Sequence, residues 1–250
     1  MITISVANQK GGTGKTTINL HLAMSLAEKG HKVVLIDNDS QGNSTLSLTK
    51  NKYTTISEVN TFDLYQDAFV NVKAESNITV LKADRNLSKI ERFKDNTPLV
   101  FKKNVLSLAD EFDYCLIDNP PALGMGLLSA LVVSDFVYTP IEMTDFSIDG
   151  IKNLLATING IKAKHNPNLE FIGIIPNRLN SNDPRQKEKF VKLLKAFGKK
   201  IIQTPIVLRS SIGEAVELGV PVWEIKKSAA RKATVEMRAA IDFIEQSAGV

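Results

Sequence analysis

Two lysines flank a glycine-rich stretch near the start of the chain, where residues 7–17 read ANQKGGTGKTT. The three glycines of this stretch let the backbone curl around phosphate groups, because a residue without a Cβ adopts left-handed conformations readily. Lys15 is placed to reach the β- and γ-phosphates of a nucleotide, and the hydroxyl of Thr16 is suited to a magnesium ion. We therefore expect a nucleoside triphosphate site. One lysine suffices for a phosphate loop, so Lys10 needs another explanation.

Aspartates stand at the ends of two further predicted strands. The segment LIDNDSQGN at 35–43 contains Asp37 and Asp39, and YCLIDNPPALG at 114–124 contains Asp118. Phosphoryl transfer needs one carboxylate that orients the attacking water and others that hold the metal ion. An aspartate at a strand end can also simply cap a loop or a helix. Beside the glycine loop, we favour the catalytic interpretation.

These residues can meet only if the strands that carry them end together. Short apolar, β-branched segments alternate with helical ones, and the predicted strands are 3–7, 32–37, 78–83, 114–118, 136–141, 171–177 and 200–206. The alternation predicts an α/β fold with a mainly parallel twisted sheet, helices on both faces and a single domain over 1–250. Gly30 is expected to end the first helix, 41–55 to form the loosest part, and 181–186 to form a loop that caps the next helix.

The segment KGGTGKTT at 10–17 resembles the deviant Walker A motif of the ParA/MinD ATPases, a family of P-loop NTPases with an extra signature lysine at the place of Lys10. Gln9 stands where the general phosphate-loop motif has glycine. The resemblance extends from Ile2 to about residue 225. It implies an ATP-bound homodimer in which Lys10 reaches across to the phosphates held by the other subunit.

The same resemblance implies roles for the remaining site residues. The catalytic residues would be Lys10, Lys15 and Asp39, which orients water. The magnesium ion would be held by Thr16, Asp37 and Asp118. The switch that senses the γ-phosphate would comprise Asn119, Pro120, Pro121 and Gly124. The nucleotide would contact Lys10, Gly11, Gly12, Thr13, Gly14, Lys15, Thr16 and Thr17, with Asn177 reading adenine and Pro205 packing on the base. Asn38 and Ser40 replace the leucine and proline usual beside the aspartate pair.

Several classes of protein are excluded by composition. The single cysteine, Cys115, lies in a predicted strand as a core residue, so relatives that hold an iron–sulfur cluster or zinc with paired cysteines do not fit. The longest uncharged apolar run, at 127–133, is too short to cross a bilayer. Acidic residues in the C-terminal helix would be repelled by anionic lipid. We expect a cytoplasmic protein with no membrane partner.

Positive charge is concentrated late in the chain, whose formal net charge is +4 and whose pI is near 9.0. One cluster spans 185–200 and another spans 226–232, with Arg209 between them. A lysine-rich helix is often only a solvated face. ATP-bound ParA dimers bind DNA without sequence preference, and phosphate contacts by lysine and arginine suffice for that. We assign DNA contacts to Arg209, Lys226, Lys227, Arg231 and Lys232.

The function implied is that of a DNA-partition ATPase for plasmid or chromosome segregation. ATP and Mg²⁺ would produce a nucleoid-associated dimer, and a ParB-type centromere-binding partner would stimulate its slow hydrolysis and release it. Because the first predicted strand starts at about residue 2, we expect no N-terminal helix-turn-helix domain. Alternatives are an ATPase that positions a protein cargo, a MinD-like cell-division-site ATPase, and a metabolic ligase such as dethiobiotin synthetase, whose loop would not need Lys10.

Overall fold

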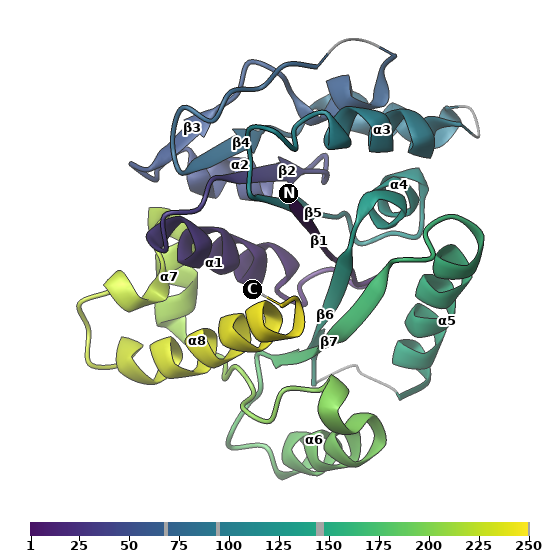
Figure 1. Cartoon of the computed structure of the whole chain (residues 1–250). Helices are drawn as coiled ribbons and strands as arrows, with labels where there is room; N and C mark the ends of the chain where they lie inside the picture. Colours follow the sequence, from purple (N-terminus) through teal and green to yellow (C-terminus); the bar gives the residue numbers. More distant parts are fainter. Residues whose placement is uncertain (68–69, 94–95, 144–147, 250) are drawn as a thin grey trace.

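The computed structural model describes residues 1–67, 70–93, 96–143 and 148–249. Within them, seven parallel strands form one sheet in the order β3-β4-β2-β5-β1-β6-β7 (Figure 1). The strands are β1 (Ile2–Val6), β2 (Val33–Asp37), β3 (Thr54–Ile56), β4 (Ile78–Leu81), β5 (Tyr114–Asp118), β6 (Phe136–Glu142) and β7 (Glu170–Asn177). The α-helices are α1 (Lys15–Glu28), α2 (Asn43–Leu48), α3 (Thr97–Leu106), α4 (Met125–Val133), α5 (Ile148–Lys164), α6 (Pro184–Phe197), α7 (Ser210–Leu218) and α8 (Ala230–Ser247). Short 3₁₀ segments are η1 (Thr61–Tyr65), η2 (Arg85–Arg92), η3 (Gly198–Lys200) and η4 (Val222–Glu224).

The central strands are buried on both faces, which explains their continuous apolar sequences. Every residue of β2 and β5 is buried. Side chains alternate across the sheet, so Leu35 joins one hydrophobic cluster while Val34 and Ile36 join the cluster on the other face. The predicted α/β class, with a parallel sheet covered on both faces, is confirmed.

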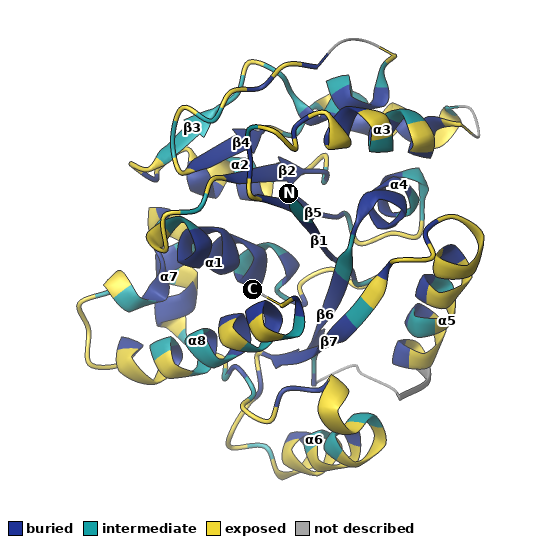
Figure 2. Cartoon of the chain, viewed as in Figure 1, coloured by how far each residue is buried: buried dark blue, intermediate teal, exposed yellow. Residues whose placement is uncertain are grey.

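Two layers of helices enclose the sheet. Helices α1, α7 and α8 cover one face, α3, α4 and α5 cover the other, and α6 packs beyond the edge strand β7 (Figure 1). The strands between them are mostly buried, while the helices expose their outer sides (Figure 2). Cys115 lies in this interior with no exposed surface, as predicted for a core residue. No helix of the described residues is both long enough and apolar enough to cross a membrane.

One predicted strand, 200–206, is wrong. The segment runs beside β7 but makes only isolated contacts, in which the Ile202 amide donates to Ile174 and the Ile206 amide donates to Pro176. Two exposed polar residues and then Pro205, which has no N–H to donate, interrupt the ladder between these contacts. The other six predicted strands are present.

The segment 41–55 is more ordered than its polar sequence predicts. It contains α2 and the start of the edge strand β3. The helix is held by a tertiary contact, because the Thr45 amide and hydroxyl both donate to Asp37. Gly30 follows α1 with φ of 88°, and Asp183 caps α6 by accepting from the Arg185 amide, so both helix-boundary predictions are confirmed.

A buried histidine joins α1 to η4. His21 Nδ1 lies 2.7 Å from the Thr17 carbonyl, and its Nε2 accepts from the Val222 amide at 3.1 Å. A carbonyl can only accept, so the ring is the neutral tautomer with its proton on Nδ1. Burial lowers the pKa of His21 to about 4.

We expect His21→Gln to flatten the pH dependence of stability between about pH 6.5 and pH 4. The unfolded chain binds a proton at this histidine more readily than the folded chain does, so the stability present above pH 6.5 is lost as pH falls toward the folded pKa of about 4. The full effect is roughly 3 kcal/mol of unfolding free energy. Urea unfolding at several pH values measures it, and equal slopes in wild type and variant would contradict the assignment.

Candidate functional site

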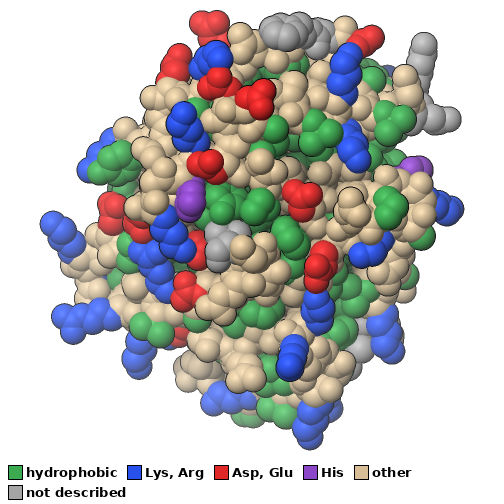
Figure 3. Space-filling view, in the orientation of Figure 1, with side chains coloured by type: hydrophobic (Ala, Val, Ile, Leu, Met, Phe, Trp, Pro, Cys, Tyr) green, Lys and Arg blue, Asp and Glu red, His purple; other side chains and the backbone are tan. Residues whose placement is uncertain are grey.

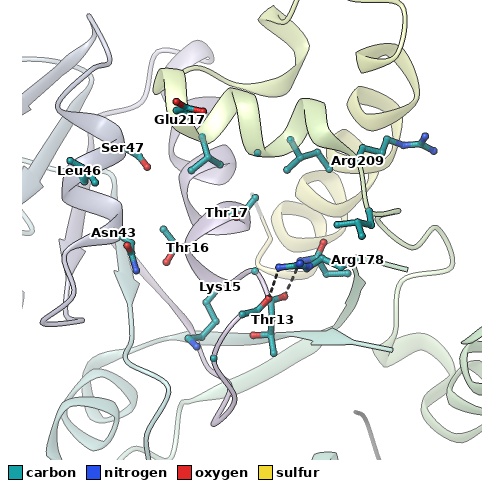
Figure 4. A pocket seen from close by; sticks show the side chains of 18 of the residues that line it. Thr13, Lys15, Thr16, Thr17, Asn43, Leu46, Ser47, Arg178, Arg209 and Glu217 are labelled. Atoms are coloured by element: carbon teal, nitrogen blue, oxygen red, sulfur yellow. Dashed lines mark hydrogen bonds between the residues drawn. The ribbon is translucent and has the colours of Figure 1, made fainter. Parts of the chain in front are cut away.

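A cleft of about 980 Å³ lies at the carboxyl ends of β1, β2, β5 and β7 (Figure 4). Ligands of open α/β sheets bind at this edge, and the strand register aligns both Val6 and Asp37 with Asp118. Its lining comprises Gly11, Gly12, Thr13, Gly14, Lys15, Thr16, Thr17, Asp39, Gln41, Asn43, Leu46, Ser47, Lys50, Pro121, Asn177, Arg178, Val207, Leu208, Arg209, Ser210, Ile212, Gly213, Val216 and Glu217.

The glycine loop curls between β1 and α1 as predicted. Gly12 and Gly14 have φ of 76° and 94°, in the left-handed region that favours glycine. Helix α1 begins at Lys15 without a side-chain cap. Since the first amides of a helix have no intrahelical partner, they are available to a phosphate in the cleft.

Lys15 lies at the centre of this loop. Its side chain is buried, and Nζ donates to the Lys10 carbonyl at 3.2 Å. Burial lowers the pKa of Lys15, while the nearby carboxylates of Asp118 and Asp39 raise it. The positive charge of the ammonium group is therefore stabilised by these carboxylates rather than by bulk solvent.

The strand-end aspartates are held by hydroxyl groups. Asp118 Oδ2 accepts from Thr16 Oγ1 at 2.6 Å and from Ser44 Oγ at 2.7 Å. Asp37 Oδ2 accepts from both the amide and the hydroxyl of Thr45, at 2.7 and 2.6 Å. The sequence interpretation missed Ser44 and Thr45, although both follow the aspartate-bearing loop directly.

The other oxygen of each aspartate is buried without a hydrogen-bond partner. These atoms are Asp37 Oδ1 and Asp118 Oδ1. Burial, together with the charge of Asp118, raises the pKa of Asp37 to about 7, and burial raises the pKa of Asp118. Asp118, which accepts from Thr16, and its register neighbour Asp37 thus each keep one unsatisfied oxygen, the type of ligand that a hard cation such as Mg²⁺ prefers.

The described residues contain no group of three or more His, Cys, Asp or Glu side chains that could hold a metal ion. In nucleotide-dependent enzymes Mg²⁺ is usually held by one or two carboxylates together with phosphates and water rather than by a cage of protein ligands.

Asp39 and Lys10 occupy different positions relative to the cleft. Asp39 is half-buried, lines the cleft, and accepts from the Gln41 amide at 3.0 Å through Oδ1. Lys10 is exposed, and its amide donates to Asn8 Oδ1 at 2.9 Å. Thus Asp39 forms part of the cleft wall, while Lys10 lies outside the described lining.

The predicted switch residues lie in different environments. Asn119 is buried, donating to the Val6 carbonyl and accepting from Asn38. Pro121 lines the cleft, whereas Pro120 is half-buried outside the lining. At the far end of the segment, Gly124 lies against the Glu91 carboxylate, which accepts from the Met125 amide.

The residues predicted to contact the base also differ in placement. Asn177 lies in the cleft and its Nδ2 donates to the Thr13 carbonyl at 2.8 Å. Pro205 is half-buried outside the lining, which is formed instead by the residues from Val207 onward. Arg178, which the sequence interpretation missed, lies beside Thr13 (Figure 4).

The residues assigned to DNA contact are only partly available. Arg209 lies in the cleft wall and forms an ion pair with Glu236, at 2.6 Å between Nη2 and Oε1. Lys227 pairs with Glu214 at 2.7 Å. Figure 3 shows Lys and Arg side chains over the segment between α7 and α8 and over α6. The exposed members of the predicted set are Lys226, Lys227, Arg231 and Lys232.

Comparison with known proteins decides the family. A family model described as an AAA domain matches residues 1–171. Protein IncC of Escherichia coli is 38% identical over 253 residues, covering 98% of this chain and 69% of IncC. The chromosome partitioning protein ParA of Caulobacter vibrioides is 32% identical, covering 88% of this chain and 85% of ParA. The chain belongs to the ParA/IncC family of partition ATPases.

A solved structure resembles this ParA-family chain over most of its length. The cobyrinic acid a,c-diamide synthase from Mycobacterium smegmatis, with bound ADP and magnesium, has a TM-score of 0.73 and 26% identity, covering 87% of this chain and 91% of the synthase. The resemblance predicted from the deviant Walker A segment is therefore confirmed, and the fold is that of P-loop NTPases.

Proposed function

We propose that this chain is an ATP-dependent DNA-partition protein that hydrolyses ATP to ADP and phosphate. The observation that carries the proposal is the meeting of Lys15, Thr16 and the two half-satisfied aspartates at one edge of the sheet. Partition relatives that cover nearly the whole chain support the cellular role.

Each residue of the site would have a separate role in hydrolysis. Lys15 binds the β- and γ-phosphates, together with the amides at the start of α1. The Thr16 hydroxyl would hold Mg²⁺ directly, and Asp118 and Asp37 would hold it through water. Bound magnesium supplies electrostatic stabilisation of the charge that develops on the phosphate oxygens. Asp39 orients the attacking water, and Lys10 of the opposite subunit adds positive charge at the γ-phosphate.

Two further contacts serve nucleotide recognition. Because the Nδ2 group of Asn177 already donates to Thr13, its side-chain oxygen is the atom that would accept from the adenine amino group. The half-buried Pro205 would pack at the edge of the base. The switch segment from Asn119 to Gly124 would respond to the γ-phosphate through Pro121, its residue in the cleft.

The ATP-bound homodimer would bind DNA non-specifically through Arg209, Lys226, Lys227, Arg231 and Lys232. A ParB-type partner would stimulate slow hydrolysis and thereby release the protein from the nucleoid into the cytoplasm. The test is binding to non-specific duplex DNA without nucleotide, with ADP, and with ATP and Mg²⁺, over a salt series, with the monomer–dimer ratio followed in parallel. Salt-sensitive binding that requires ATP and appears with the dimer is expected.

Charge pairing favours one alternative, an ATPase that positions a protein cargo. Arg209 and Lys227 face Glu236 and Glu214, and this pairing reduces the charge available to phosphate. In this case ATP would produce the dimer without DNA binding in the same experiment.

We expect the Lys10→Ala variant to bind ATP as a monomer with unchanged affinity but to form no dimer. Its hydrolysis rate should fall about 100-fold, the effect of removing one charge-stabilising group. Lys10 lies outside its own described cleft lining, so its contribution should come from the opposite subunit. Gln9→Ala is the neighbouring control and should behave as wild type.

Mixing two inactive variants distinguishes action across the dimer from action within a subunit. Lys15→Ala cannot hold ATP but still carries Lys10, which it can offer to the ATP bound by a Lys10→Ala subunit. Partial recovery of hydrolysis is expected in the mixture. An absence of recovery, with mixed dimers present, would contradict the trans role.

A further inference from the structure

Arg178 has an unusual backbone conformation. Its φ is 54°, and within the described residues it is the only non-glycine residue with positive φ. Left-handed conformations are unfavourable for a residue with a Cβ atom and persist where the surroundings hold them, often at functional sites. Arg178 follows the last residue of β7 and lines the nucleotide cleft.

The side chain of Arg178 bridges a strand end to the glycine loop. Its Nη1 donates to the Gly12 carbonyl in a long hydrogen bond of 3.4 Å, and its Nε lies 3.5 Å from Glu142 Oε1 at the end of β6. The preceding residue makes a parallel contact, since Asn177 Nδ2 donates to the Thr13 carbonyl at 2.8 Å. Figure 4 shows Arg178 beside Thr13, with dashed hydrogen bonds between this end of β7 and the glycine loop.

The geometry of the peptide bond relates these carbonyl contacts to the orientation of the backbone amides in the same peptide groups. In a trans peptide the C=O and N–H bonds point in opposite directions, and the described chain has no cis peptide. The Gly12 carbonyl shares its peptide with the Thr13 amide, and the Thr13 carbonyl shares its peptide with the Gly14 amide. Holding both carbonyls toward β7 therefore directs both amides away from β7.

We propose that Asn177 and Arg178 form a carbonyl clamp that aims the Thr13 and Gly14 amides at the nucleotide phosphates. Arg178 is then a positioning residue for nucleotide binding, held in place by Glu142. The clamp rests on the proposed nucleotide site, and it acts on ADP and ATP alike because it positions the loop rather than the γ-phosphate.

The clamp gives a second reason for glycine at position 14. A Cβ atom built on Gly14 would overlap Nδ2, the side-chain nitrogen of Asn177. The same residue thus allows the left-handed backbone and the close approach of Asn177 to Thr13. Neither requirement is visible in the loop alone, because the clamp and the loop are separated by 164 residues.

The decisive variant is Arg178→Gly. Glycine accepts the left-handed backbone without strain, so the variant should unfold at the wild-type temperature or above it. We expect its dissociation constants for ADP and for a non-hydrolysable ATP analogue to rise about 10-fold, the effect of one lost charge-assisted hydrogen bond. KM for ATP should rise by a similar factor with kcat nearly unchanged, a split that a general loss of structure would not produce.

Three further variants complete the test, together with the wild-type protein. Arg178→Lys keeps the charge but has no fork to join Gly12 to Glu142, so it should also bind nucleotide weakly. Arg185→Ala removes an exposed arginine of α6 and should bind as wild type does. Wild-type affinity in Arg178→Gly would overturn the clamp. Failure of the wild-type protein to bind either nucleotide would instead overturn the proposed function, and Lys15→Ala marks the background of both assays.

Discussion

Asp39→Ala is expected to bind ATP and dimerise normally while hydrolysing ATP about 100- to 10,000-fold more slowly, the usual contribution of a positioned general base. Asp39 lines the cleft beside Lys15 and is oriented by the Gln41 amide at 3.0 Å. Its removal takes away the carboxylate that orients water but leaves the phosphate loop, Thr16 and Asp118 in place. Single-turnover hydrolysis and ATP affinity, measured on the same preparation, separate the two effects.

The isosteric variant Asp39→Asn sharpens this test. An amide keeps the size and the contact with Gln41 but cannot accept a proton in the way a carboxylate does. We expect it to be nearly as slow as Asp39→Ala, and its ATP-bound dimer should remain on DNA longer than wild type does. Hydrolysis at the wild-type rate in either variant would show that another group orients the water.

Lys15→Ala is expected to weaken ATP and ADP binding by at least about 100-fold, because several charge-assisted hydrogen bonds to phosphate depend on this ammonium group. The side chain is buried in the loop and is balanced by Asp118 and Asp39. Removing its charge leaves the buried carboxylate of Asp118 and the half-buried carboxylate of Asp39 without this nearby cation, so the variant should also be less stable above neutral pH. Calorimetric titration with ADP measures the first effect.

Lys15→Met separates charge from packing, since methionine refills the buried space without an ammonium group. It should lose nucleotide binding as completely as Lys15→Ala while losing less stability. Lys162→Ala, on the exposed side of α5, is the matched control. Retention of wild-type nucleotide affinity in Lys15→Met would contradict the role of Lys15 in phosphate binding.

The parts of the fold that the sequence predicts are those with local signals. Continuous apolar runs mark the central strands, and Gly30 and Asp183 mark helix boundaries by backbone preference and capping. The failures occur where local signals are weak. The segment 200–206 is apolar at both ends but interrupted by polar residues and Pro205, and α2 is a short helix held by the contact of Thr45 with Asp37.

The candidate site likewise contains features that the sequence predicts and features that it does not. The glycine loop and the strand-end aspartates are predictable, because a phosphate loop needs glycines at fixed spacing and parallel strands bring their carboxyl ends to one edge. The ion pair of Arg209 with Glu236 is not predictable from the sequence, and it reduces the positive charge that Arg209 has available for any phosphate group.

By itself, the sequence determined the chemistry of this protein: a phosphate loop with a second lysine, carboxylates at the ends of strands, and the order of strands and helices that carries them. Only the tertiary structure decided which polar atoms are satisfied. It left one buried oxygen of Asp37 and of Asp118 without a partner, and it placed Asn177 and Arg178 against the loop carbonyls. The physical reason is that motif spacing acts over a few residues, whereas hydrogen-bond partners are chosen by packing between segments far apart in the chain.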